Sequence, residues 1–141
     1  NELTTLDLSA NTALTALSCS NNNLTSLDVS ANTALTELNC HINSLTSLDV
    51  SNNSSLTYLA CYMNDITSLD VSNIAGLQHL KANSNELSSL DISNNPNFDE
   101  EYVIEIDIYD ILTDEHEKNN EVRMQASRDW ENMIGRAVVD D

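Results

Sequence analysis

The chain has 141 residues and a formal net charge of −18 at pH 7, from 23 Asp and Glu against 5 Lys and Arg. A charge of that sign argues against partners such as nucleic acid or an anionic membrane surface. No apolar run approaches the ~20 residues that a membrane-spanning helix needs, so membrane insertion is not expected. Gly (2) and Pro (1) are nearly absent, although tight turns normally need them. Asn can replace them in turns, because it tolerates left-handed backbone.

A period of 21 residues runs without insertion from the N-terminus to about residue 98. Five positions of this period are apolar in every copy, and a sixth is Asn. Such regularity indicates a solenoid, in which each repeat packs on the next. The apolar columns begin at Leu3, Leu6, Leu8, Leu14 and Leu17, and the Asn column contains Asn1, Asn22, Asn43, Asn64 and Asn85.

One period, LTALSCSNNNLTSLDVSANTA (14–34), contains L-x-x-L-x-C-x-x-N-x-L with a second L-x-x-L-x-V unit nested inside it. Each unit alternates like a short strand, and neither has room for a helix. The spacing therefore predicts a flat coil with a strand on each side, stacked at ~4.8 Å per turn.

These repeats resemble bacterial leucine-rich repeat proteins of the short, 21-residue nested type. The resemblance covers residues 1–98 and implies a mainly β fold, a right-handed solenoid of about five turns with short strands. It also implies a secreted or cell-surface protein that binds proteins or other macromolecules. The chain is less similar to the internalin type, because its period is shorter and the Pro of the internalin repeat is missing.

The two predicted strands of each turn differ in how much their outward residues vary. One strand barely changes from turn to turn, as Ser26, Asp28 and Ser30 illustrate, whereas the other keeps almost nothing. A face that must complement a partner cannot repeat one residue, and Tyr is common at such interfaces. We therefore predict a ligand-binding patch on the varying face; the alternative is a solvated surface that has drifted. The predicted patch contains Glu37, Asn39, His41, Tyr58, Tyr62, His79 and Lys81, with Ile42 and Met63 extending an apolar rim.

The constant strand carries a row of carboxylates, one in each turn, flanked by hydroxyl groups. We interpret this row as a solvated side wall of the solenoid. The alternative is that its hard oxygen ligands hold Ca²⁺, as in a calcium-dependent adhesin. The row contains Asp7, Asp28, Asp49, Asp70 and Asp91.

The three cysteines, Cys19, Cys40 and Cys61, are 21 residues apart, in phase with the inward leucines. Zinc sites need close pairs of ligands, so free thiols in the core are expected and no metal site is. Cys40 and His41 are adjacent and therefore point to opposite sides of a strand. No catalytic motif is present, so neither enzymatic activity nor a cofactor is expected.

The period fails after Phe98, and residues 99–141 are predicted to form an acidic C-terminal cap. Residues 102–109 alternate like a strand with one apolar face, and residues 114–139 have the apolar stripe of a helix. An open solenoid end needs such a cover. The alternative is that the helical stripe docks on another subunit.

Taken together, these patterns favour a noncatalytic module that recognises a protein or glycan ligand, in an extracellular or bacterial cell-surface location. A second hypothesis is a structural accessory subunit of a cell-surface assembly. A third, weaker hypothesis is the calcium-dependent adhesin.

Overall fold

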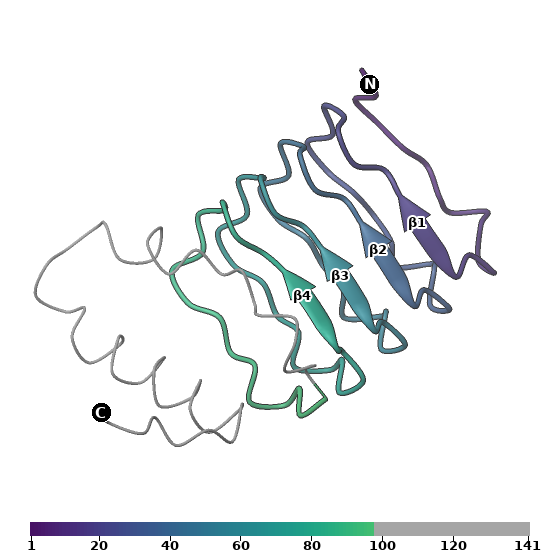
Figure 1. Cartoon of the computed structure of the whole chain (residues 1–141). Coiled ribbons are helices and arrows are strands. Elements are labelled where there is room, and N and C mark those ends of the chain that lie inside the picture. The colour runs from purple at the N-terminus through teal and green to yellow at the C-terminus, as the bar shows by residue number, and fades with distance from the viewer. Residues whose placement is uncertain (98–141) are drawn as a thin grey trace, which may run out of the picture.

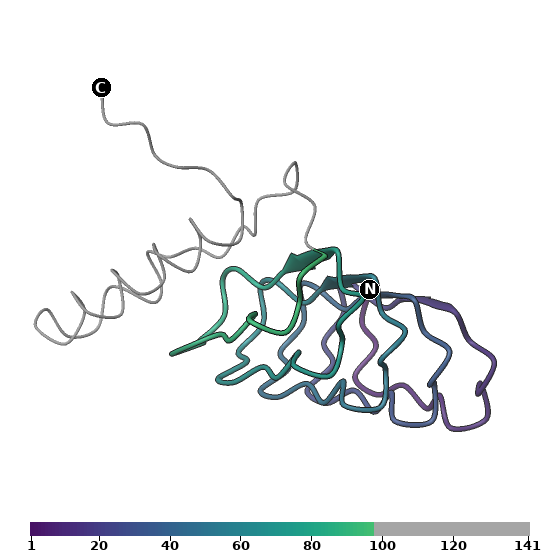
Figure 2. The same ribbon diagram turned by 90° about the horizontal axis from the view of Figure 1, so that it is seen from below.

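The computed structural model describes residues 1–97. The proposed cap, with its strand at 102–109 and its helix at about 114–139, lies outside the described residues. Within residues 1–97 the chain winds into stacked coils without a helix (Figures 1 and 2), and no segment there could cross a membrane as a helix. The prediction of a mainly β solenoid is confirmed for this part. Its strands are β1 (Ala16–Ser18), β2 (Glu37–Asn39), β3 (Tyr58–Ala60) and β4 (His79–Lys81).

The strands form one parallel sheet in the order β1-β2-β3-β4, so each coil pairs with the coils before and after it. The register places Glu37 beside Tyr58, and Tyr58 beside His79, which are 21 residues apart in each case. The hydrogen bonds continue past the strand ends, for example from the Cys19 N–H to the Asn39 carbonyl at 2.9 Å. Each strand has three residues, but the backbone hydrogen bonds between adjacent coils extend beyond these three.

The prediction of a second strand in each turn is wrong for the described residues. On that side adjacent coils share single bonds, such as Ser44 N–H to the Leu24 carbonyl at 2.9 Å. Local competition contributes, because side-chain acceptors take some of the N–H groups that a second ladder would need. Thus the backbone N–H of Ser51 donates to Oδ1 of Asp49 at 2.9 Å, and the other four Asp residues of the row accept the same bond.

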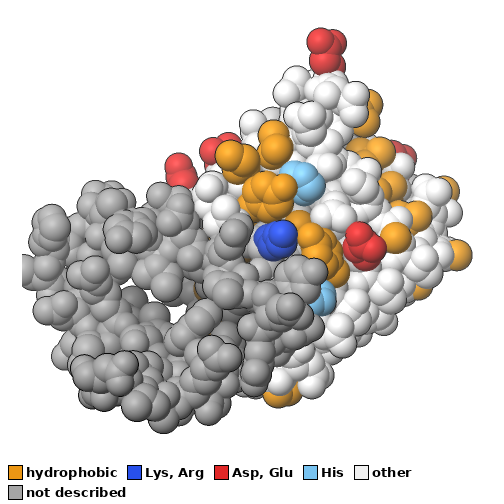
Figure 3. All heavy atoms as spheres, viewed as in Figure 1, with side chains coloured by type: hydrophobic (Ala, Val, Ile, Leu, Met, Phe, Trp, Pro, Cys, Tyr) orange, Lys and Arg blue, Asp and Glu red, His pale blue; other side chains and the backbone are white. Residues whose placement is uncertain are grey.

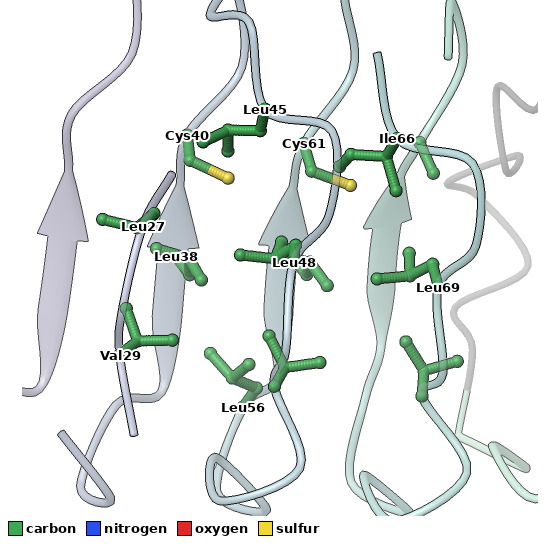
Figure 4. Packing of buried hydrophobic residues seen from close by; sticks show 14 of the residues in the cluster. Leu27, Val29, Leu38, Cys40, Leu45, Leu48, Leu56, Cys61, Ile66 and Leu69 are labelled. Carbon is green, nitrogen blue, oxygen red and sulfur yellow. The ribbon is translucent and has the colours of Figure 1, made fainter. Parts of the chain in front are cut away.

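The predicted apolar columns fill the inside of the coils. Figure 4 shows leucine, valine and cysteine side chains of successive turns converging between the two sides of the coil. Leu24, Leu45 and Leu59 have no exposed surface, whereas Leu3 in the first turn remains 49% exposed. Leu3 has a neighbouring coil on one side only among the described residues, so stacking is what buries the columns.

The predicted Asn column connects each coil to its neighbour through side-chain hydrogen bonds. Asn64 shows the arrangement: its Nδ2 donates to the carbonyls of Cys61 (2.9 Å) and Cys40 (3.2 Å). Its Oδ1 accepts the N–H of Leu45 at 3.0 Å. A single buried amide therefore satisfies backbone groups of two successive coils, which is what buried polar groups require. The same inter-coil acceptor bond is made by Asn22, Asn43 and Asn85.

A second Asn column, which sequence reasoning missed, holds the opposite corner of the coil. The Nδ2 of Asn53 donates to the Val29 carbonyl (3.0 Å) and to the Asn32 carbonyl (2.9 Å). Asn32, Asn53 and Asn95 are all buried, while Ile74 occupies the same place in the fourth turn. The 21-residue period itself is the signal that would have identified this column.

Replacing Asn64 with Ala should lower the free energy of unfolding by about 2–4 kcal/mol, because several buried backbone groups lose their partner at ~1–3 kcal/mol each. Urea denaturation of the full chain measures this loss. Asn52→Ala is the matched control, since Asn52 is exposed and donates one long bond of 3.4 Å to the Ser30 carbonyl. Equal stability of the two variants would contradict the proposed role of the Asn column.

Candidate functional site

The structure places all seven predicted patch residues on one face, formed by the outward positions of the strands and the residues that follow them. We call this surface the variable face. Register makes Glu37, Tyr58 and His79 neighbours in one row, and Asn39, Ala60 and Lys81 neighbours in the next. A third row contains His41 and Tyr62, whose rings are in contact. The seven residues are therefore contiguous.

Aromatic rings of successive coils pack against each other on this face. The rings of His41 and Tyr62 are stacked, with centroids 4.4 Å apart and planes 8° apart. Tyr58 and His79 form a tilted pair, with centroids 6.0 Å apart and planes at 54°. Offset or tilted ring contacts of this kind stabilise by ~0.5–1.5 kcal/mol. These contacts also restrict the orientations of the paired rings in the unbound protein.

His41 is held as a neutral side chain. Burial lowers the pKa of His41, and the positive charge of Lys81 lowers it further. Its Nδ1 is enclosed and has no hydrogen-bond partner among residues 1–97. At neutral pH His41 therefore contributes an uncharged aromatic surface.

Ala60 lies at the centre of the variable face. It is flanked along the strand by Tyr58 and Tyr62, and across the sheet by Asn39 and Lys81. Although its position points outward, it is buried, with 1% of its surface exposed. A small residue in this place lets the larger side chains close around the centre of the face.

The charges of the variable face lie beside its apolar groups. Lys81 is the single Lys or Arg of residues 1–97. Glu37 is oriented by Asn39, whose Nδ2 donates to Oε1 of Glu37 at 3.0 Å. Figure 3 shows hydrophobic, His and Lys side chains gathered together over the strands, with acidic side chains mainly around the edges. The variable face thus combines apolar, aromatic and charged side chains.

The Asp row has a structural role on the constant side of the coil, where the outward residues repeat from turn to turn. The hydroxyl and the backbone N–H of Ser51 lower the pKa of Asp49, and the charge of Asp70 opposes that effect. Among residues 1–97, no three His, Cys, Asp or Glu side chains form a group able to hold a metal ion. The hydrogen bonds to Ser account for the repetition of Asp.

The lowered pKa of the Asp row predicts a dependence of stability on pH. A carboxyl group whose pKa is lowered by folding stabilises the folded chain above its unfolded pKa, here 3.8, and this contribution disappears as the pH falls through the folded value. The melting temperature should therefore drop between pH 5 and pH 3 more steeply for the native chain than for Asp49→Asn. Parallel curves for the two proteins would contradict a stabilising role for the ionised Asp49.

The cysteine column is buried in the core, as predicted, and all three thiols are free. Burial raises the pKa of Cys61 to about 12, and it raises the pKa of Cys40 well above its usual value. Cys40 is inside the coil whereas His41 is on the variable face, so this adjacent pair is not a shared site. Thiolates are the reactive form, and these thiols are held protonated.

The native chain should therefore react slowly with a chromogenic thiol reagent at pH 8, and all three thiols should react at once in 8 M urea. Cys19 should react first, because it keeps 5% of its surface exposed while Cys40 and Cys61 keep none. Fast reaction of two or more thiols in the native chain would contradict the buried column.

Comparison with known proteins adds evidence on the family. No protein-family model matches the chain, and no curated protein matches it. Solved structures do match. The functional domain of InlJ from Listeria monocytogenes, described as including a cysteine ladder, is 40% identical over 70% of this chain and 28% of that one, with a TM-score of 0.53.

A leucine-rich repeat protein of Leptospira interrogans is 30% identical over 61% of this chain and 24% of its own, with a TM-score of 0.58. The internalin InlF of Listeria monocytogenes is 25% identical over 64% of this chain and 27% of its own, also with a TM-score of 0.58. The chain thus spans less than a third of each of these structures. The likeness to these structures, with 40% identity over 70% of this chain in the case of InlJ, leads to one conclusion: the chain is a leucine-rich repeat protein, similar to those of bacteria.

Proposed function

We propose that the chain is a noncatalytic recognition module that binds a protein, or alternatively a glycan, through the variable face. The similar structures include two internalin-type proteins of a bacterium, and leucine-rich repeat proteins of this kind are typically binding modules. The same similarity supports a secreted or cell-surface location. The proposed contact residues are Glu37, Asn39, His41, Tyr58, Tyr62, His79 and Lys81.

One observation carries this proposal: the residues that differ between turns are contiguous on one face, while the repeated residues are used by the fold. The repeated Asp and Asn residues make hydrogen bonds within or between coils. The rings of Tyr58 and Tyr62 instead pack against histidine rings of adjacent coils, in rows whose residues change from coil to coil. Their identity is therefore free to match a ligand.

The scaffold also suits recognition physically. A face built on a hydrogen-bonded sheet, with rings already packed, loses little conformational freedom when a partner binds. Tyr side chains present a large apolar area and a polar hydroxyl group, which is the combination found at interface hot spots. A mixed face of this kind favours a macromolecular partner over a small charged ligand.

The calcium-dependent adhesin has less support than the recognition module. Each Asp of the row already accepts a backbone N–H through Oδ1. The hypothesis of an accessory subunit that docks through the C-terminal helix concerns residues outside the described part of the chain.

The proposal is tested by selecting ligands from a displayed random-peptide library and a printed glycan array with the full chain. Replacing Tyr58 and Tyr62 with Ala should weaken binding of the recovered ligands at least tenfold, because each Tyr contributes about 1 kcal/mol or more at a hot spot. Titration calorimetry or surface-binding measurements give the affinities.

Ser68→Ala with Ser89→Ala is the matched control, since both residues are exposed on the constant side of the coil. This control should bind like the native chain. Equal affinity of the native chain and the Tyr58/Tyr62 variant for every ligand would refute the proposed site.

A further inference from the structure

The backbone just after each strand adopts a left-handed conformation that few residues tolerate. The φ angles are 58° at Asn21, 53° at Ile42, 54° at Met63 and 54° at Ser84. Asn suits this conformation, because its short polar side chain bonds locally. A β-branched residue such as Ile is a genuine outlier there.

This conformation belongs to the coil and not to the individual residue. The N–H of Ile42 donates to the Tyr62 carbonyl at 3.0 Å, and the N–H of Met63 donates to the Asn83 carbonyl at 3.1 Å. The same inter-coil bond holds Asn21 against His41. Four successive coils of residues 1–97 thus have positive φ at this position whatever residue stands there, and stability alone would favour Asn in each of them.

Burial in the core does not explain why Ile42 and Met63 are apolar. Ile42 is 41% exposed and Met63 is 52% exposed. Leu3 is the other large apolar residue in the described part of the chain that is equally exposed, and it belongs to the first turn. Strained residues whose side chains remain in solvent are a recognised sign of a functional surface.

The two residues directly follow a stacked pair of rings, and together they form what we call the rim strip: His41, Ile42, Tyr62 and Met63. The stacked rings belong to successive coils and are nearly parallel, so their faces point along the solenoid axis and their edges point outward. A sugar ring binds best to an open aromatic face. Ring edges that point outward beside Ile42 and Met63 are instead suited to contacts with aliphatic or aromatic side chains.

The lack of charged residues in the rim strip also favours an apolar side chain as its ligand. The rim strip has no acidic or basic residue other than the neutral His41, in a chain whose net charge is −18. An apolar segment can therefore cover the strip without burying an unpaired charge. Charged groups of the partner would lie nearer to Glu37 and Lys81.

We propose that the rim strip determines ligand specificity, and that its occupant is a polypeptide segment with apolar side chains. This inference rests on the proposed function and makes it more specific, because it selects protein over glycan. Ile42 and Met63 are then ligand contacts retained at a cost to the stability of the coil.

The stability of single variants tests the first half of the inference. Ile42→Asn should raise the melting temperature of the full chain by a few degrees, because Asn relieves the strained backbone. Ile42→Val is the matched control and should bring no increase, because Val is also β-branched. An unchanged or lower melting temperature for Ile42→Asn would overturn the claim that Ile42 is retained at a cost.

Binding of the double variant Ile42→Asn, Met63→Asn tests the second half. Peptides selected on the native chain from a displayed random library should share apolar residues and bind this variant at least tenfold more weakly. Glycan-array signals should be absent from the native chain. Peptides that bind both proteins equally, or a glycan lost by the variant, would overturn the inference. Ligands that still depend on Tyr58 and Tyr62 would leave the proposed function intact.

Discussion

The solenoid depends on the side chain of one repeated Asn, which substitutes for regular structure that the coil lacks. The sheet covers one side of the coil in residues 1–97, and buried backbone groups elsewhere must also be satisfied. Asn43 and Asn64 each accept an N–H from the preceding coil and donate to carbonyls of both coils. The bonds recur at the same spacing in successive coils, in step with the 21-residue period.

The other constant positions follow from the same requirement. Leucines fill the space enclosed by the coil, and thiols at the Cys40 and Cys61 positions pack as small apolar groups. Asp49 and its equivalents close the turn on the constant side by accepting the N–H of Ser. The outward residues of β2, β3 and β4 are not repeated from coil to coil. Under the proposed function, these residues can change with the ligand while the repeated residues keep the coils stacked.

The hydrophobic period was sufficient to predict the stacked coil, the inward columns and the contiguity of Glu37, Tyr58 and His79, because register follows directly from a fixed repeat. It did not predict that residues 1–97 have one strand in each coil and not two, since local side-chain bonds such as that of Asp49 compete with a ladder that alternation alone suggests. Nor did it reveal the left-handed backbone at Ile42, because the residue there is not one that signals such a turn. Asn32 and Asn53 were missed although they obey the period.

The central claim is that the constant residues supply stability and the variable face supplies recognition. The most direct measurement is the free energy of unfolding of a variant in which four face residues are replaced by their first-turn equivalents, namely Tyr58→Ala, His79→Ala, His41→Ser and Tyr62→Ser. The account predicts that these four changes together cost less stability than Asn64→Ala alone, since they remove two ring contacts of ~0.5–1.5 kcal/mol each. A larger loss than that of Asn64→Ala would show that the variable face is part of the framework and contradict the account.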